Sequence, residues 1–124
     1  EYETMASKAL ESLFFLGERK KKMPGGFSDK WKPDWSYNCP TGDCQIALCY
    51  LRIFELKQDH RYLNAACRLY SNVTKTLNRN GALPGSCPSW GRYMRFRFPN
   101  WASKFYMDLI YQLFKCLSKE TSKV

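Results

Sequence analysis

The sequence predicts an all-α protein built from two antiparallel helical hairpins, four helices in total, with two long loops on one face. Four segments repeat apolar residues at the three- and four-residue spacing of a helix, and alternation with period two is confined to a brief stretch at 92–98. The 124 residues, 44% of them hydrophobic, suit a single domain with one core. The second half of the chain also repeats the order of Trp, Pro and helix seen in the first.

The apolar periodicity places the helices at 4–18, 41–57, 59–78 and 100–118. The first helix carries its apolar residues on one side, at Met5, Ala9, Leu13 and Leu16, with Phe14 beside them. Thr41, Asp59 and Asn100 are the expected N-caps of the other three helices, because their side chains can accept a hydrogen bond from the first turn. Asp43 is a favourable acid in the first turn of the second helix. The stretch at 92–98 is expected to be an extended loop.

The connections between these helices differ in length. A short turn at Lys57-Gln58 joins the second and third helices, whereas loops of roughly twenty residues join the other pairs. Because neighbouring helices run antiparallel, both long loops are expected at the same end of the molecule. Long loops without secondary structure are uncommon in compact domains and are often functional. This end is therefore the expected working face.

The two halves of the chain correspond to each other. Trp35 and Tyr37 match Trp90 and Tyr93, and the dipeptide Pro40-Thr41 matches Pro99-Asn100. The matching caps are 59 residues apart. We therefore expect two hairpin repeats, at about 4–57 and 59–118, followed by a disordered tail at about 119–124.

Charge and cysteine content narrow the classes of function. The net charge of +9 favours anionic partners, but the cations form no single stripe and no nucleic-acid-binding motif is present, which disfavours nucleic acid. No apolar run is long enough to span a membrane. The six cysteines include no CxxC pair, and four of them fall in apolar helical patterns. We expect reduced, structural cysteines and a cytoplasmic location.

One long stretch resembles a known superfamily. The segment "WSYNCPTGDCQIALCYLRIFELKQDHRYLNAA", followed by "GALPGS…WGRY…FPNWASKF", is similar to bacterial helical-hairpin repeats of the α/α-toroid superfamily, which includes terpene cyclases, protein prenyltransferases and sugar-acting enzymes. The resemblance covers about residues 5–117 and points to proteins of polysaccharide-related loci. A full toroid has more hairpins than the two present here. The resemblance therefore implies either further repeats in a parent chain or a homo-oligomer that completes the ring.

The metal chemistry of prenyltransferases is not expected in this chain. Asp43 and Cys44 are adjacent, so on a helix they point about 100° apart. The single histidine, His60, lies beside the short turn at the opposite end. Zinc needs three or four convergent ligands. No metal and no cofactor are therefore predicted, and the acid-rich motif of terpene cyclases is absent.

Two carboxylates are weak candidates for catalysis. Sugar hydrolases use a pair of carboxyl groups, and Asp34 and Asp43 both fall at the loop-rich end. Each also has a simpler role, Asp34 as a turn residue and Asp43 as a first-turn helix acid. Whether the protein is an enzyme is left open by the sequence.

The candidate ligand-binding residues are the rings and cations of the two loops and of the start of the last helix, namely Trp35, Tyr37, Trp90, Arg92, Tyr93, Arg95, Trp101 and Lys104. Flat rings stack on sugars, and Arg and Lys bind anionic groups beside helix N-termini. The simpler interpretation is that the rings pack the loops onto the helix ends and the cations are solvated. The first hypothesis is a carbohydrate-binding or carbohydrate-acting protein; the alternative is a non-catalytic helical module that docks a protein.

Overall fold

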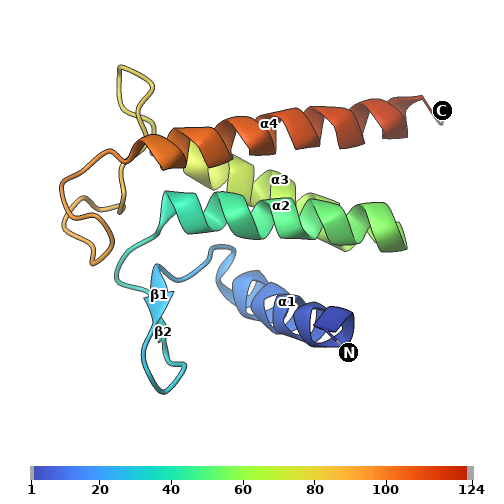
Figure 1. Ribbon diagram of the computed structural model, residues 1–124, viewed down its shortest axis with the longest axis horizontal. Helices are drawn as coiled ribbons and strands as arrows, with labels where there is room; N and C mark the ends of the chain where they lie inside the picture. Colours follow the sequence, from blue (N-terminus) through green and yellow to red (C-terminus); the bar gives the residue numbers. More distant parts are fainter. Residues whose placement is uncertain (1, 123–124) are drawn as a thin grey trace.

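The computed structural model describes residues 2–122 and is mostly helical, which confirms the all-α class (Figure 1). The helices of this part of the chain are α1 (Tyr2–Lys20), α2 (Pro40–Lys57), α3 (His60–Thr74) and α4 (Asn100–Thr121). A small antiparallel pair, β1 (Gly26–Phe27) and β2 (Pro33–Asp34), lies in the first long loop. The sequence did not predict this pair, because strands of two residues show no alternation.

Helix α2 is the centre of the molecule. It packs most extensively against α3 and α4, while α1 makes a lighter contact with α2 and α3 (Figure 1). The largest buried side chains come from several elements and include Tyr50, Met23, Leu51, Leu83, Leu109 and Val73. Each side chain of this kind contributes roughly 1.5–3 kcal/mol when it leaves water. The core therefore runs along α2 and is closed by the other helices.

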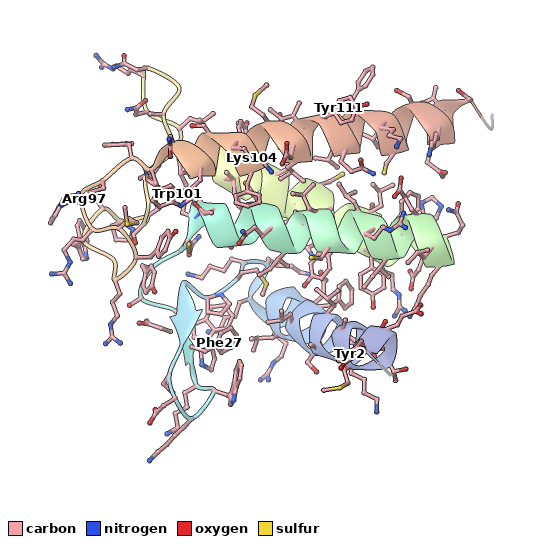
Figure 2. The ribbon with its side chains drawn as sticks, in the orientation of Figure 1. Tyr2, Phe27, Arg97, Trp101, Lys104 and Tyr111 are labelled. Atoms are coloured by element: carbon pink, nitrogen blue, oxygen red, sulfur yellow. The ribbon has the colours of Figure 1, made fainter. Side chains whose placement is uncertain are left out.

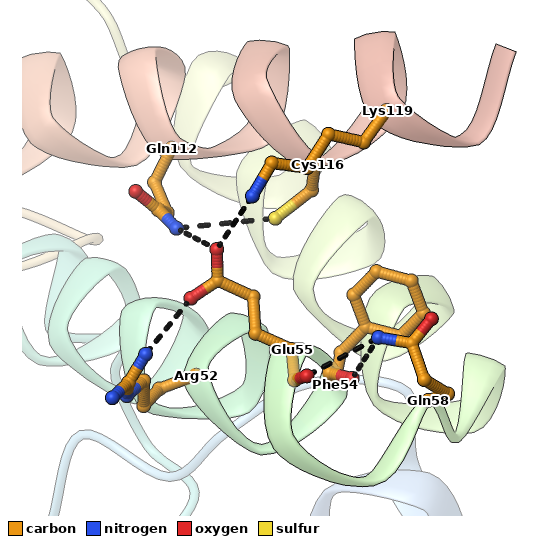
Figure 3. Close-up of polar contacts among 7 residues, drawn as sticks. All are labelled: Arg52, Phe54, Glu55, Gln58, Gln112, Cys116 and Lys119. Atoms are coloured by element: carbon orange, nitrogen blue, oxygen red, sulfur yellow. Dashed lines mark hydrogen bonds and ion pairs between the residues drawn. The ribbon is translucent and has the colours of Figure 1, made fainter. Parts of the chain in front are cut away.

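Polar contacts also connect α2 to α4. The Glu55 side chain accepts a hydrogen bond of 3.0 Å from Nε2 of Gln112 and lies 3.8 Å from Nζ of Lys119 (Figure 3). Its other oxygen lies 3.3 Å from Nη1 of Arg52. This half-buried carboxylate therefore has partners on its own helix and on the neighbouring one, which favours one alignment of α4 along α2.

The side of α1 that faces the core is the expected one only in the second half of the helix, where Phe14 is buried and Leu13 packs against the core. Met5 and Ala9 are exposed, and the buried residues of this helix are Phe14 and Gly17. The ring of Phe14 packs 4.9 Å from that of Tyr62, centroid to centroid. A Cβ atom at Gly17 would lie 2.7 Å from Sδ of Met23, so this glycine lets the chain after α1 fold back closely. Aromatic packing and this close approach together set the rotation of the helix.

Two of the three predicted N-caps are wrong. The cap of α2 is Cys39 and that of α4 is Pro99, and neither side chain caps a backbone N–H. Thr41 lies inside α2 because Pro40 takes the first helical position, for which the fixed φ of proline is well suited. In α4 the proline is the N-cap itself, with extended backbone at ψ 134°, and Asn100 is the first helical residue. Asp59 is confirmed, since its carboxylate accepts a hydrogen bond of 3.0 Å from the backbone N–H of Arg61.

Two helix ends also differ from the expectation. Helix α3 ends at Thr74, four residues early, and Asn78 instead forms a turn in which its side chain accepts from the backbone N–H groups of Asn80 and Ala82. Helix α4 continues to Thr121, so residues 119–121, expected in the disordered tail, are helical. Residues 123–124 of that tail lie outside the described residues. No helix between residues 2 and 122 has the length and apolarity to cross a membrane.

The two long loops meet at one end of the molecule (Figure 1). The backbone N–H of Asn38 donates to the carbonyl of Cys87 at 2.8 Å, and the N–H of Cys87 returns a bond of 3.0 Å to Asn38. A strand-like bridge therefore joins residues that are far apart in the sequence. This junction positions the candidate site.

Candidate ligand groove between the two long loops

The first long loop is shaped by a tight turn between β1 and β2. The hydroxyl of Ser28 accepts hydrogen bonds of 3.2 Å from the backbone N–H groups of Lys30 and Lys32. The N–H of Trp31 donates to the carbonyl of Ser28 at 3.0 Å, with Trp31 in the left-handed region at φ 55°. Serine favours such turns because its hydroxyl can replace a backbone acceptor. The turn holds the Trp31 ring in solvent, where it lies 6.0 Å from the ring of Phe27.

The second long loop folds into consecutive turns and is not extended at 92–98, contrary to the expectation. The Ser86 hydroxyl donates to the carbonyl of Tyr93, and the N–H of Phe96 donates to the carbonyl of Ser89 at 2.8 Å. Met94 and Phe96 both have positive φ values, of 44° and 55°. Residues in the left-handed region turn the chain, so the segment is not extended. The alternation of residue types at 92–98 gives no indication of these turns.

Tyr37 packs both loops together at their junction. Its side chain is 7% exposed, its ring lies directly against Gly25, and a Cβ atom at Gly91 would come 2.8 Å from its own Cβ. Burial is the main cause that raises the pKa of its phenol, and the charge of Asp34 adds to it. Tyr37 is therefore part of the wall between the loops. Its role matches the simpler interpretation of the rings, which is packing.

A groove of about 500 Å³ opens beside this junction. Its walls come from the β1–β2 hairpin, from the segment 34–37 that follows it, and from the second loop through Arg92. Four of the sequence-predicted residues therefore come together here: Asp34, Trp35, Tyr37 and Arg92. Phe27, Ser28 and Lys32 also line the groove. Sequence reasoning missed these three, although "GGFSDKWKPDW" offered a signal in its alternating rings and lysines between turn residues.

The groove holds a carboxylate and cations close together. Oδ1 of Asp34 accepts bonds from the N–H and the hydroxyl of Ser36, at 3.0 and 2.5 Å. These hydrogen bonds, with a smaller effect of Arg92, lower the pKa of Asp34, which stays ionised at neutral pH. Nε of Arg92 lies 3.7 Å from Oδ2, which is a loose and solvent-exposed ion pair. The guanidinium is thus available to a stronger anionic partner.

The Trp35 ring has a cation of its own. The ammonium of Lys20, at the end of α1, lies 5.7 Å from the ring centroid. Together with Lys32 and Arg92, this lysine makes the surroundings of the ring positive. Such an environment combines a flat apolar surface with charged groups that attract anions.

The remaining predicted residues lie outside the groove. Trp90 is 65% exposed, and Arg95 is also exposed. The indole N–H of Trp101 donates to the hydroxyl of Tyr93 at 2.9 Å, which attaches the second loop to the first turn of α4. Lys104, one turn further along α4, pairs with Asp108 at 2.5 Å. Figure 2 shows Trp101 and Lys104 on this part of α4, with Arg97 near the tip of the loop.

Asp43 is buried in the first turn of α2 and does not line the groove. Burial raises the pKa of its carboxyl to about 8, an effect that the charge of Lys22 only partly opposes. The group is therefore mostly neutral at pH 7. The two candidate carboxyls consequently differ in charge and in setting, since Asp34 is a half-buried anion at the groove and Asp43 a buried acid.

Among residues 2–122, no three His, Cys, Asp or Glu side chains gather where they could hold a metal ion. The six cysteines are free thiols, with Cys44 and Cys116 buried and Cys49 exposed. Comparison with known protein families, with curated proteins and with solved structures found no match for this chain.

Proposed function

We propose that this chain is a pair of α/α-toroid-type hairpin repeats whose loop-rich end binds an acidic carbohydrate. The repeat is supported by the pattern of burial. A displacement of 59 residues, taken from the matching Pro-Thr and Pro-Asn dipeptides, places three buried residues of α4 on three buried residues of α2. The pairs are Ala102 with Asp43, Leu109 with Tyr50, and Leu113 with Phe54. These three positions support a repeat, although the buried Cys44 and Cys116 correspond to the exposed Ser103 and Lys57.

The groove between the loops is the observation that carries the carbohydrate proposal. Trp35 offers a flat ring for the apolar face of a sugar, and Ser28 and Ser36 offer hydroxyl groups for its polar edges. Arg92 and Lys32 suit a carboxylate or sulfate, because a guanidinium can bind such groups through two parallel hydrogen bonds. An acidic sugar fits this combination better than a neutral one.

Binding is favoured over hydrolysis. Hydrolysis by the usual mechanism needs two carboxyl groups on either side of the scissile bond. Among the residues that line the groove, Asp34 is the one carboxylate, and Ser36 and Arg92 already engage it. We therefore assign Asp34 the positioning of Arg92, with no catalytic step.

Titration with uronic-acid oligosaccharides tests the proposal. Trp35→Ala is expected to weaken binding at least about tenfold, which corresponds to about 1.4 kcal/mol. Arg92→Ala is expected to weaken acidic ligands while leaving any binding of neutral oligosaccharides unchanged. Trp90→Ala removes an exposed ring outside the groove and is the matched control, expected to bind as the wild type does. Equal losses in Trp35→Ala and Trp90→Ala would count against the groove.

The alternative is a protein-interaction module, and one observation favours it. The two loops expose large rings at Trp31, Trp90 and Phe96, and aromatic rings of this kind are enriched at protein interfaces. In that case no oligosaccharide binds, and the Trp90→Ala and Phe96→Ala variants lose a protein partner that Trp35→Ala retains. Binding to duplex DNA with a steep dependence on salt would instead support the nucleic-acid hypothesis.

A further inference from the structure

Helix α4 presents an uncovered apolar stripe on its outward side. Met107, Tyr111 and Phe114 follow one another at helical spacing and are 62–70% exposed, with Leu117 next to them. The opposite side of the same helix buries Ala102, Leu109, Leu113 and Cys116. Figure 2 shows Tyr111 projecting away from α2, while part of this residue also borders the groove between α2 and α4. A helix that is apolar on both sides is normally covered on both sides, so the stripe requires a partner.

The internal repeat indicates what kind of partner fits. With the same displacement of 59 residues, the stripe residues Met107, Tyr111 and Phe114 correspond to Leu48, Arg52 and Glu55 of α2. These three residues of α2 lie on the side turned toward α4, where they line the groove between the two helices. The side of α4 that carries the stripe is therefore equivalent to the side of α2 that packs toward α4. In α4 this side faces outward. The expected partner is another helix of the α2 type.

A matching surface exists on the other side of the molecule. The groove between α1 and α2 has a volume of about 420 Å³ and a largely apolar lining from Ala6, Leu10, Cys49, Ile53 and Leu56. The polar residues Glu3, Ser7, Arg52 and Lys57 also line it. Leu56 is 61% exposed there. In Figure 1, α1 and α4 lie on opposite sides of α2, so a single molecule cannot bring its own stripe to its own groove.

We propose that the α4 stripe docks into the α1–α2 groove of a second copy of this chain, so that copies associate head to tail. From typical side-chain areas, the four stripe residues expose about 500 Å². A stable interface buries about 800 Å² on each partner, so the stripe alone would supply more than half of the area that a stable contact needs. This contact repeats between copies the helix packing that already joins the two halves within one copy. The proposal rests on the internal repeat of the proposed function, but it does not depend on the loop groove or its ligand.

Light scattering after size exclusion, on the whole chain at rising concentration, tests the proposal. The wild type is expected to exceed the mass of one copy, while Phe114→Glu and Leu56→Glu are each expected to remain monomeric. An equimolar mixture of the two variants is expected to form dimers that do not grow, because each pair retains one intact stripe and one intact groove. Phe96→Glu, at an exposed loop position, is the control and should associate as the wild type does.

Three outcomes would overturn the proposal. The first is a wild type that stays monomeric at millimolar concentration, which would mean that something other than a second copy covers the stripe. The second is association that survives Phe114→Glu. The third is loss in Phe114→Glu with no change in Leu56→Glu, which indicates that two α4 stripes pair with each other. Circular dichroism confirms that each variant folds, as expected for substitutions at exposed positions.

Discussion

At the scale of single residues, Asp43 shows how far tertiary packing changes the chemistry of a side chain. Its position in the first turn of α2 follows from the sequence, and an ionised acid is favourable there. Burial outweighs that preference and raises the pKa of its carboxyl to about 8. No local pattern around Asp43 predicts this burial, because the covering residues belong to other elements.

Asp43→Asn is expected to stabilise the protein at neutral pH. In the unfolded chain the carboxyl titrates near its ordinary value of 3.8, whereas in the folded protein it does so near 8. Because the folded state binds the proton more tightly than the unfolded state, the free energy of unfolding is highest below pH 4 and decreases as pH rises from 4 to 8. The neutral amide removes this loss, so the variant should exceed the wild type by at least about 1 kcal/mol at pH 7 and match it near pH 4.

Urea unfolding at several pH values between 4 and 8 measures the difference. Asp29→Asn removes a negative charge at an exposed loop position and is the matched control. A free energy of unfolding that differs between Asp43→Asn and the wild type by the same amount at every pH would contradict the buried, neutral carboxyl.

At the scale of elements, the helices were predictable and their ends less so. The four apolar segments became α1 to α4, because helical periodicity over many residues is a strong signal. Each N-cap had to be chosen between neighbouring residues. Pro40 begins α2 and places its cap at Cys39 instead of Thr41, and Pro99 is the cap of α4 instead of Asn100. The exposure of Met5 and Ala9 in α1 could not be predicted, because these residues are as apolar as several that are buried.

The cap of α3 offers a direct test at this scale. Asp59→Ala removes a side-chain acceptor for the N–H of Arg61 and should lower the free energy of unfolding by about 1 kcal/mol. Asp59→Asn retains the acceptor and loses the charge that pairs with the Arg61 guanidinium, an exposed contact that contributes little. Denaturant unfolding should therefore rank the wild type close to Asp59→Asn, and both above Asp59→Ala. Equal losses in the two variants would show that charge matters more than capping.

At the scale of the whole molecule, the two loops act as one structure. The bridge between Asn38 and Cys87 and the packing of Tyr37 against Gly25 and Gly91 join segments that different parts of the chain supply. The sequence predicted that both loops lie at one end, since that follows from the order and direction of the helices. It also placed Trp35 and Arg92 in a binding surface, and both line the groove. It could not separate them from Trp90, because the left-handed turns that shape the second loop have no simple sequence signature.

Gly91→Ala tests whether the loop junction matters. A Cβ atom at this position would lie 2.6 Å from Cβ of Ser86 and 2.8 Å from that of Tyr37. The neighbours must move, which costs roughly 1–3 kcal/mol of stability and should also weaken ligand binding at the groove. Gly42→Ala is the control, since its nearest contact would be at 3.6 Å and alanine favours the helix. Thermal unfolding in which Gly91→Ala matches Gly42→Ala would contradict this account of the junction.

The central claim is that the groove beside Trp35 receives an acidic sugar, and the four tryptophans allow it to be tested in one experiment. Each indole N–H of Trp31, Trp35, Trp90 and Trp101 gives its own signal in a nitrogen-correlated NMR spectrum. Titration with a uronic-acid oligosaccharide is expected to shift the Trp35 signal and the backbone signals near Arg92, while the Trp90 signal stays in place. A titration that shifts Trp90 and leaves Trp35 unchanged, or that shifts none of the four, would contradict the claim.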